Sequence, residues 1–250
     1  MAQRAAMLLA LAVTAGAACA ATVYPSGPSV PENLLRIELR FDQPLQGPLA
    51  MTQVHLLAED GSEIAGAFLD LPLPSADGRR LSLLLHPGRV KSGLGANLAL
   101  GRALTAGSPV TLLVKDSSIG ARVLKTWRVT PFDAAPPEPD RWTFQSPRTG
   151  SREALVLRLD RVLSSPAEAM IAVRGPDGAR VEGTGRLEAS ETAWRFTPAR
   201  PWRAGRHALV VHPELETPTG NRACGAFESV RASEAHCNAA ALTRSFDLPP

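Results

Sequence analysis

The residues best suited to bind a ligand lie in one stretch, residues 86–102. This stretch contains no acidic side chain, and it holds three fixed positive charges and four glycines. Glycines expose backbone N–H groups and cations attract anions, so the composition suits a carboxylate, a phosphate or a sulfated sugar. The candidate contact residues are Arg89, Lys91, Asn97 and Arg102.

A second interpretation of the stretch is structural. Four apolar residues could hold it against the domain as a compact surface loop: Val90, Leu94, Leu98 and Leu100. We favour this interpretation, because most surface loops carry no ligand even though binding residues gather on loops. The stretch is not a Walker loop, since the Gly-Lys-Ser/Thr ending is missing.

Two cysteines predict one disulfide. Cys224 and Cys237 are the only cysteines that remain once residues 1–20 are removed, and such a pair in an exported chain favours a bridge. Closing a loop of about 13 residues would stabilise the fold by roughly 3 kcal/mol. The alternative is a metal pair with His236, which is one ligand short of a structural zinc site. We predict no metal site and no cofactor.

No catalytic centre is predicted. The chain has no Gly-x-Ser-x-Gly motif, and both cysteines are assigned to the bridge. Asp42 and Asp160 stand at matching places in two repeated segments, so a domain's length would separate them and they could not share a glycosidic bond. We expect each to accept backbone N–H bonds at a strand end. The sequence favours a protein that is not an enzyme.

Strands must position these residues, because apolar residues alternate with a period of two. Residues 35–41 place Leu, Ile, Leu and Phe on one side, and Arg36, Glu38 and Arg40 on the other. This alternation predicts a half-buried strand with a polar outer face in solvent. Residues 155–159 repeat it.

Further strands are predicted between turn signals such as Asp60-Gly61, Asp77-Gly78 and Asp177-Gly178. The ranges are 54–57, 65–71, 81–85, 110–114, 123–129, 142–144, 154–159, 170–173, 180–182, 193–196, 206–211 and 242–248. No helix longer than two turns is expected, and 166–170 could form one turn. Such short strands at regular spacing are typical of β-sandwiches.

The chain divides into two similar units. Leu104-Thr105-Ala106-Gly107 is echoed by Trp202-Arg203-Ala204-Gly205. We predict a signal peptide over 1–20, a first sandwich over 21–133, a Pro-rich linker over 134–141 and a second sandwich over 142–250 with the disulfide-closed insertion.

The N-terminal sequence and the charge balance indicate where the protein is located and which partners it lacks. Arg4, an apolar run over 5–21 and Ala18-Cys19-Ala20 predict secretion with cleavage after Ala20. A lipidated Cys19 is the alternative, but the usual Leu three places upstream is absent. No later stretch is long and apolar enough to span a membrane. Basic residues are spread out and nearly balanced by acids, which excludes a nucleic-acid binder.

Four tryptophans could form a sugar-stacking platform or fill cores. Trp127 and Trp194 lie within strand patterns and are expected in cores. Trp142 adjoins the linker and Trp202 lies in a turn, so either could pack at the domain junction or face a partner. We favour core and junction packing.

Two motifs carry a family resemblance. Phe41-Asp42-Gln43-Pro44-Leu45 ends a strand as Phe-x-x-Pro-Leu, and the segment from Ala204-Gly205 to Gly220-Asn221 introduces a late strand and its loop. The chain resembles bacterial immunoglobulin-like domains of cell-envelope proteins. The resemblance implies an all-β fold of two tandem immunoglobulin-like β-sandwich domains after a signal peptide. Thr217 replaces the usual Asp, and His207 replaces an aromatic residue.

The resulting hypothesis is an exported, non-catalytic interaction or structural module of the cell envelope, located in the periplasm or secreted. It would recognise a protein or an anionic partner through surface loops, and sandwich edges could add a partner strand. The alternative is a periplasmic carrier of a small ligand or of copper.

Overall fold

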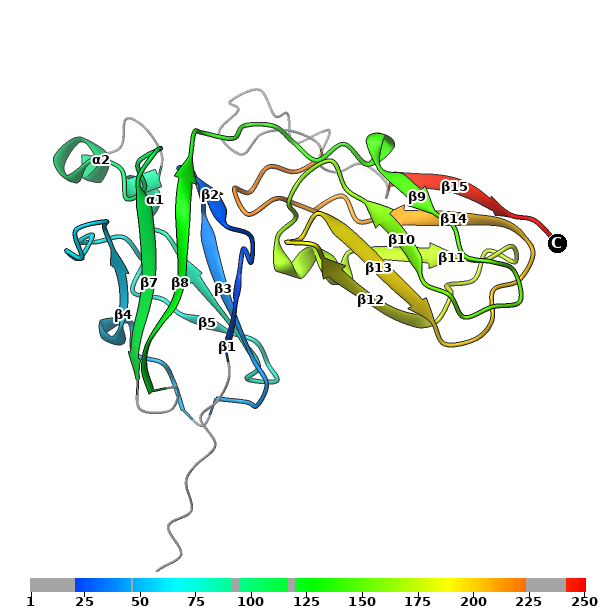
Figure 1. Ribbon diagram of the computed structural model, residues 1–250, viewed down its shortest axis with the longest axis horizontal. Coiled ribbons are helices and arrows are strands. Elements are labelled where there is room, and N and C mark those ends of the chain that lie inside the picture. The colour runs from blue at the N-terminus through cyan, green and yellow to red at the C-terminus, as the bar shows by residue number, and fades with distance from the viewer. Residues whose placement is uncertain (1–20, 46, 91–94, 117–119, 224–241) are drawn as a thin grey trace, which may run out of the picture.

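Two β-sandwiches, one after the other, make up the protein. A computed structural model describes residues 21–45, 47–90, 95–116, 120–223 and 242–250. In Figure 1 the strands of the first sandwich stand upright, and those of the second run across the view. The fold is therefore all-β, as the alternating apolar pattern predicts.

The first sandwich packs two four-stranded sheets, ordered β1-β3-β6-β5 and β2-β8-β7-β4. Its strands are β1 (Ala21–Tyr24), β2 (Ser29–Pro31), β3 (Arg36–Phe41), β4 (Val54–Leu57), β5 (Leu73–Pro74), β6 (Arg80–Leu84), β7 (Pro109–Asp116) and β8 (Gly120–Thr130). Neighbouring strands are antiparallel, except that β2 runs parallel to β8.

The second sandwich packs a sheet ordered β12-β13-β10-β9 against a sheet ordered β11-β14-β15. Its strands are β9 (Thr143–Gln145), β10 (Leu155–Arg158), β11 (Ile171–Arg174), β12 (Gly183–Glu188), β13 (Ala193–Pro198), β14 (Gly205–Val211) and β15 (Leu242–Leu248). The figure shows β11 ending on the side of this domain that faces away from the first.

Helices are short. The α-helices are α1 (Pro87–Val90) and α2 (Gly95–Leu100), and the 3-10 turns are η1 (Met51–Gln53), η2 (Pro139–Arg141) and η3 (Ser165–Ala169). The turn η3 confirms the single turn expected near 166–170. In the part of the chain that the structure describes, no helix has the length and apolar character to cross a bilayer.

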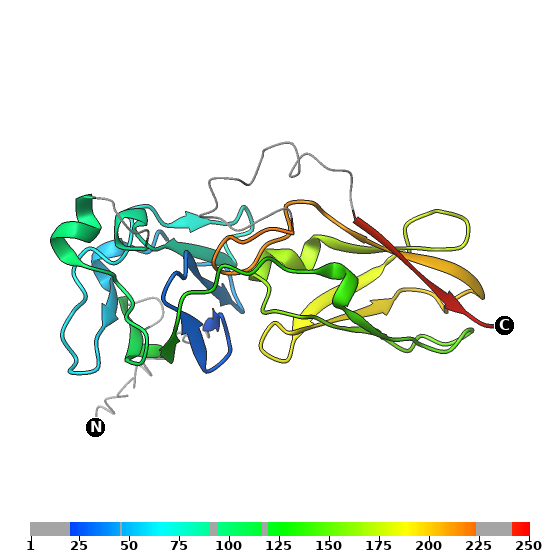
Figure 2. The same cartoon turned by 90° about the horizontal axis from the view of Figure 1, so that it is seen from above.

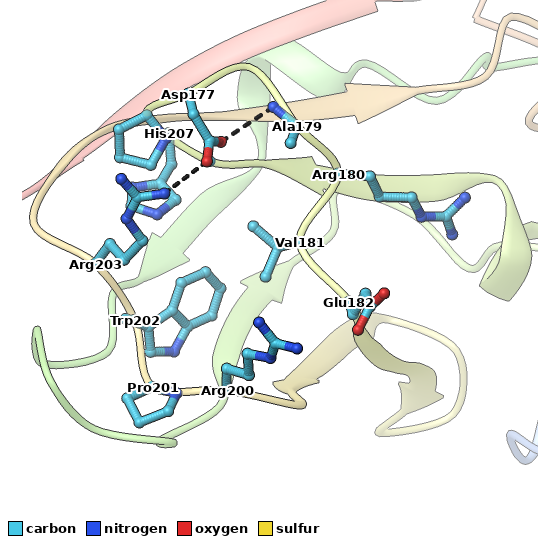
Figure 3. Close-up of a pocket in the computed structure, with 12 residues that line it drawn as sticks. Asp177, Ala179, Arg180, Val181, Glu182, Arg200, Pro201, Trp202, Arg203 and His207 are labelled. Carbon is cyan, nitrogen blue, oxygen red and sulfur yellow. Dashed lines mark hydrogen bonds and ion pairs between the residues drawn. The ribbon is translucent and has the colours of Figure 1, made fainter.

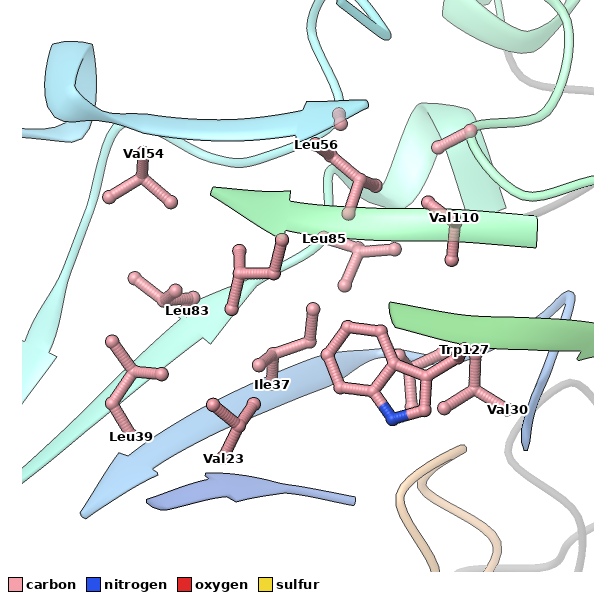
Figure 4. Close-up of a cluster of buried hydrophobic side chains, with 14 of the residues drawn as sticks. Val23, Val30, Ile37, Leu39, Val54, Leu56, Leu83, Leu85, Val110 and Trp127 are labelled. Atoms are coloured by element: carbon pink, nitrogen blue, oxygen red, sulfur yellow. The ribbon is translucent and has the colours of Figure 1, made fainter. Parts of the chain in front are cut away.

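Each sandwich has its own apolar core. In the first, Val23, Ile37 and Leu39 of one sheet face Val110 and Trp127 of the other (Figure 4). Their burial follows from the period of two, since every second side chain of a strand enters the space between the sheets. This arrangement confirms the apolar side of β3 and the core position of Trp127.

The second core contains a continuous row of aromatic rings. Neighbouring ring centroids along the row lie 5.2 to 5.9 Å apart. In order, the rings are Phe144, Phe246, His207, Trp202, Phe196 and Trp194. Edge and offset contacts of this kind stabilise a core beyond the area they bury. Trp202 and His207 are therefore interior residues, and so is Trp142, which is 1% exposed.

Two predicted strands are wrong. Residues 65–71 form no strand, because Gly66 adopts a left-handed φ of 60° and only Phe68 makes a bridge, to Leu85. Residues 180–182 are where the chain changes sheets. The Val181 N–H bonds to the Val173 carbonyl of β11, and Gly183 then pairs with Pro198 of β13. The strand β12 thus begins after the range expected for it.

The polar side of β3 is covered by the second sandwich. The sequence predicts this side in solvent, but it packs against loops at one end of that domain. Glu38 is only 4% exposed, and Arg40 donates to the Ser165 hydroxyl at 3.1 Å. Both views place this end of the second domain beside β1 and β3 (Figure 2). The domains therefore meet end against face, rather than end to end along the linker.

Candidate functional site

The three proposed residues that the structure describes, Arg89, Asn97 and Arg102, do not form one surface. Arg89 is 5% exposed, and its guanidinium donates to the carbonyls of Ala65 and Arg102, the latter at 3.3 Å. Asn97 lies in α2, where its carbonyl accepts the Gly101 N–H. Lys91 lies outside the described residues. Arg89 therefore stabilises the loop through buried hydrogen bonds. Of these candidates, Arg102 lines a pocket of the first sandwich.

The predicted disulfide cannot be placed, since Cys224 and Cys237 also lie outside the described residues. Within the described ranges, no three His, Cys, Asp or Glu side chains gather in a way that could hold a metal ion.

A pocket of about 280 Å³ lies at the free end of the second sandwich (Figure 3). Two loops form it: the turn between β11 and β12, and the segment that leads into β14. Trp202 and Val181 form its apolar wall, with Arg200 beside the indole ring. The figure shows Arg200 extending toward the space beside the ring, and the Arg180 side chain extending away from it.

Local backbone chemistry shapes this pocket. The Asp177 carboxylate accepts the Ala179 N–H at 3.1 Å, which closes the turn predicted by Asp177-Gly178. Gly205 has a φ of 117°, and a Cβ built there would lie 3.1 Å from the Pro176 ring. Only glycine allows both this backbone conformation and this close approach of the two loops.

An ion pair closes one edge of the pocket. Arg203 donates to Asp177 at 2.6 Å. The Ala179 N–H and then the Arg203 guanidinium lower the pKa of Asp177 below its ordinary value of 3.8. Asp177 is therefore ionised at neutral pH and balances the charge of Arg203.

The first sandwich contains the same construction. Its pocket of about 590 Å³ is lined by the turn at Asp60 and by the segment 102–105. The Asp60 carboxylate accepts the Ser62 N–H at 2.9 Å, as Asp177 does from Ala179. In the repeat that pairs Gly107 with Gly205, the position of Arg200 corresponds to Arg102. The two pockets are thus equivalent features of the two copies.

The two pockets differ in charge. Three arginines and two acids line the second pocket: Arg180, Arg200, Arg203, Asp177 and Glu182. One arginine and two acids line the first: Arg102, Glu59 and Asp60. Arg102 also lies 3.4 Å from Glu32 and over the Phe132 ring. Arg203 is paired with Asp177 and Arg180 extends away from the pocket, so Arg200 is the cation beside the indole ring of the second pocket, whereas Arg102 of the first pocket lies beside Glu32.

The domain junction is filled by polar contacts. Arg36 of β3 pairs with Glu216, and the Leu35 N–H donates to the Pro218 carbonyl at 3.1 Å. Burial raises the pKa of Glu38 above its ordinary 4.5, although Arg36 and the Ser165 hydroxyl partly oppose this effect.

Neither cavity at the junction has the features of a substrate site. One measures about 10 Å³, which leaves space for no more than a water molecule. The other measures about 220 Å³, and its charged groups already pair with each other, with Arg161 lying 3.6 Å from Asp133 and 3.4 Å from Asp160. Asp160 also accepts the Glu138 N–H at 3.2 Å, which confirms the structural role expected for it.

The sequence pattern did not single out the pocket of the second domain, because the longer and more basic loop lies in the first domain. A signal was present in Arg200-Pro201-Trp202-Arg203, which places two arginines beside a tryptophan just before the Ala-Gly repeat. The close approach of Pro176 to Gly205, which brings the two loops of the pocket together, is not visible in linear spacing.

No protein-family model matches the chain, and no curated protein matches it significantly. Among solved structures, the chain is similar to one described as "Crystal Structure of Rst D1-D2", with 10% identity and a TM-score of 0.25. The match covers 88% of this chain and 93% of that one. At this identity and TM-score, the similarity carries no inference about function.

Proposed function

We propose that the protein is an exported, non-catalytic recognition module of the bacterial cell envelope, built from two immunoglobulin-like sandwiches. One observation carries the proposal: the end of the second sandwich is fixed against the face of the first. Ion pairs and hydrogen bonds join the two from β3, from the Ser26 segment and from Asp133, directly before the linker. Such a unit presents its free-end loops in one orientation, which suits the recognition of a partner.

The filled junction supports a binding role over a catalytic one. Clefts between domains are frequent substrate sites, but here Glu38, one buried acid of the junction, faces a cavity of about 10 Å³, and Glu191, another, is hydrogen-bonded to Ser26. The accessible pocket at the free end has no nucleophile beside a base; its charged groups are arginines and carboxylates. These groups suit charge recognition more than bond cleavage.

The test combines export with capture. We expect the full chain to be recovered from the periplasmic or secreted fraction without residues 1–20. Used as bait against solubilised envelope, it should retain a partner that a variant with a loosened junction, Arg36→Ala with Arg40→Ala, retains less well. Recovery in the cytoplasm with an intact N-terminus, or no partner retained by the wild type, would overturn the proposal.

The disulfide belongs to the same proposal, because export exposes Cys224 and Cys237 to an oxidising compartment. Alkylation without reduction should leave the intact mass of the exported protein unchanged, and alkylation after reduction should add two labels. Two labels before reduction would exclude the bridge.

A further inference from the structure

We propose that the pocket of the second sandwich binds a carboxylate attached to a small apolar group. This inference rests on the proposed function, because it names the chemistry by which a partner is recognised. The residues that carry it are Arg200, Arg203, Asp177, Val181 and Trp202.

The first step concerns the unused cation. Arg200 is exposed and makes no hydrogen bond or ion pair with any other described residue. Arg203 differs, since its charge is already balanced by Asp177 at 2.6 Å. Arg200 is therefore the guanidinium beside the indole ring that remains available to a ligand. Its planar fork of donors matches a carboxylate, which can accept two parallel hydrogen bonds.

The second step concerns the charge of the ligand. Arg180 extends away from the pocket. Arg203 pairs with Asp177, which leaves Arg200, among the described residues, as the unpaired positive charge beside the indole ring. A ligand with one negative charge neutralises that charge, whereas a phosphate monoester would bring nearly two charges at neutral pH. No helix begins at this pocket, and the Ala179 N–H is occupied by Asp177. The pocket therefore favours a monocarboxylate over a phosphate.

The third step concerns the body of the ligand. Val181, Pro176 and Pro201 supply apolar wall around the buried Trp202. A volume of about 280 Å³ is slightly below the usual range for drug-sized ligands, roughly 300–1,000 Å³. It suits a body the size of one amino-acid side chain. The carboxylate could belong to a free small acid or to the terminus of a polypeptide.

The test is a titration of the full chain with hexanoate, observed by NMR through the Trp202 indole N–H, which donates to the Glu153 carbonyl. Hexanoate should shift this resonance in a saturable manner, and uncharged hexanamide should not. We expect Arg200→Gln to weaken hexanoate binding at least tenfold. Arg200→Glu should abolish it, and an unshifted Trp202 resonance before titration shows that the pocket is still folded.

The matched control is Arg102→Gln, at the corresponding position of the first sandwich. It removes the same charge from the whole protein, so it tests whether net charge alone drives the binding. We expect hexanoate affinity to change less than twofold. Equal loss in the Arg102 and Arg200 variants, equal binding of hexanamide, or no saturable shift with hexanoate would each overturn the proposal.

A short peptide that ends in Leu distinguishes the two sources of the carboxylate. Affinity at least tenfold above that of hexanoate supports a polypeptide terminus, and similar affinities support a free acid; both outcomes support the carboxylate site. If hexanoate fails but the envelope partner is still captured, only the site is refuted. If hexanoate binds but nothing is captured, the recognition module is refuted instead.

Discussion

Glu191 of the second sandwich accepts two hydrogen bonds from Ser26 of the first, from the backbone N–H at 2.8 Å and from the hydroxyl at 2.5 Å. Glu191 is buried, and it follows two other residues with left-handed backbone, Ala189 at 50° and Ser190 at 55°. Such conformations cost on the order of 1 kcal/mol for each non-glycine residue. The contacts of this turn at the domain junction offset that cost.

Substitution of Glu191 by Ala should therefore destabilise the protein. The variant loses both bonds and leaves the Ser26 N–H without its acceptor, so the free energy of unfolding should fall by about 2 kcal/mol. Urea denaturation measures the change. Glu188→Ala is the control, because its ion pair with Arg195 is exposed and should contribute less than about 1 kcal/mol. Equal effects of the two substitutions would contradict the role given to the junction.

Gly185 on β12 should tolerate no side chain. A Cβ built there would lie 2.6 Å from the Trp194 ring, which is fully buried. Gly185→Ala should lower the free energy of unfolding by about 1–3 kcal/mol, because the core must shift to admit the methyl group. Gly47→Ala is the comparison, since no atom lies within 4 Å of its Cβ position. Thermal denaturation of both variants decides, and a Gly185→Ala protein as stable as wild type would refute this packing.

Glu38 predicts a pH dependence of stability. Because burial raises its pKa above 4.5, the folded protein binds this proton more tightly than the unfolded chain does. The stability linked to Glu38 is therefore complete below pH 4.5 and is lost as the pH rises through the folded pKa. Glu38→Gln, which cannot titrate, should gain stability relative to wild type between pH 4 and pH 7. A difference in urea midpoint that stays constant over this range would contradict the prediction.

The two sandwiches should unfold together while the contacts of β3 remain. Arg36 pairs with Glu216, and Arg40 lies 3.6 Å from Glu168. Removing both arginines takes away the partners that these partly buried carboxylates have in the first sandwich, while Arg222 and Arg186 of the second sandwich stay within 3.5 and 3.9 Å of them. The loss therefore weakens the junction more than either domain. Differential scanning calorimetry should show one transition for wild type and two for Arg36→Ala with Arg40→Ala. A single transition in the double variant would show that other contacts couple the domains.

Alternation predicted the central strands of the sheets, because it records which side of a strand is buried, but it did not predict the edge strands β1, β2 and β5. The alternation alone places Ile37 and Leu39 in the core, and both are buried. The same pattern could not show what covers the other side, since Glu38 and Arg40 look identical whether they meet water or another domain. Whether water or the second domain covers them depends on how that domain is oriented after the linker.

The candidate site was predictable only in part. The repeat aligns Arg102 with Arg200, so equivalent pockets follow from the duplication once one of them is seen. The inward turn of Arg89 was not predictable, because its acceptors are the backbone carbonyls of Ala65 and Arg102. Sequence alone does not distinguish an arginine that binds backbone carbonyls from one that binds a ligand.

The unequal placement of tryptophan gives each sandwich its own optical signal. Trp127 is the single indole of the first core, whereas Trp142, Trp194 and Trp202 lie in the second. The Trp127 ring N–H donates to the Pro25 carbonyl at 2.9 Å. Pro25 directly precedes Ser26, which binds Glu191 of the second sandwich. Fluorescence from Trp127 alone, in a protein whose other indoles are replaced by Phe, would thus report separation of the domains without an added dye.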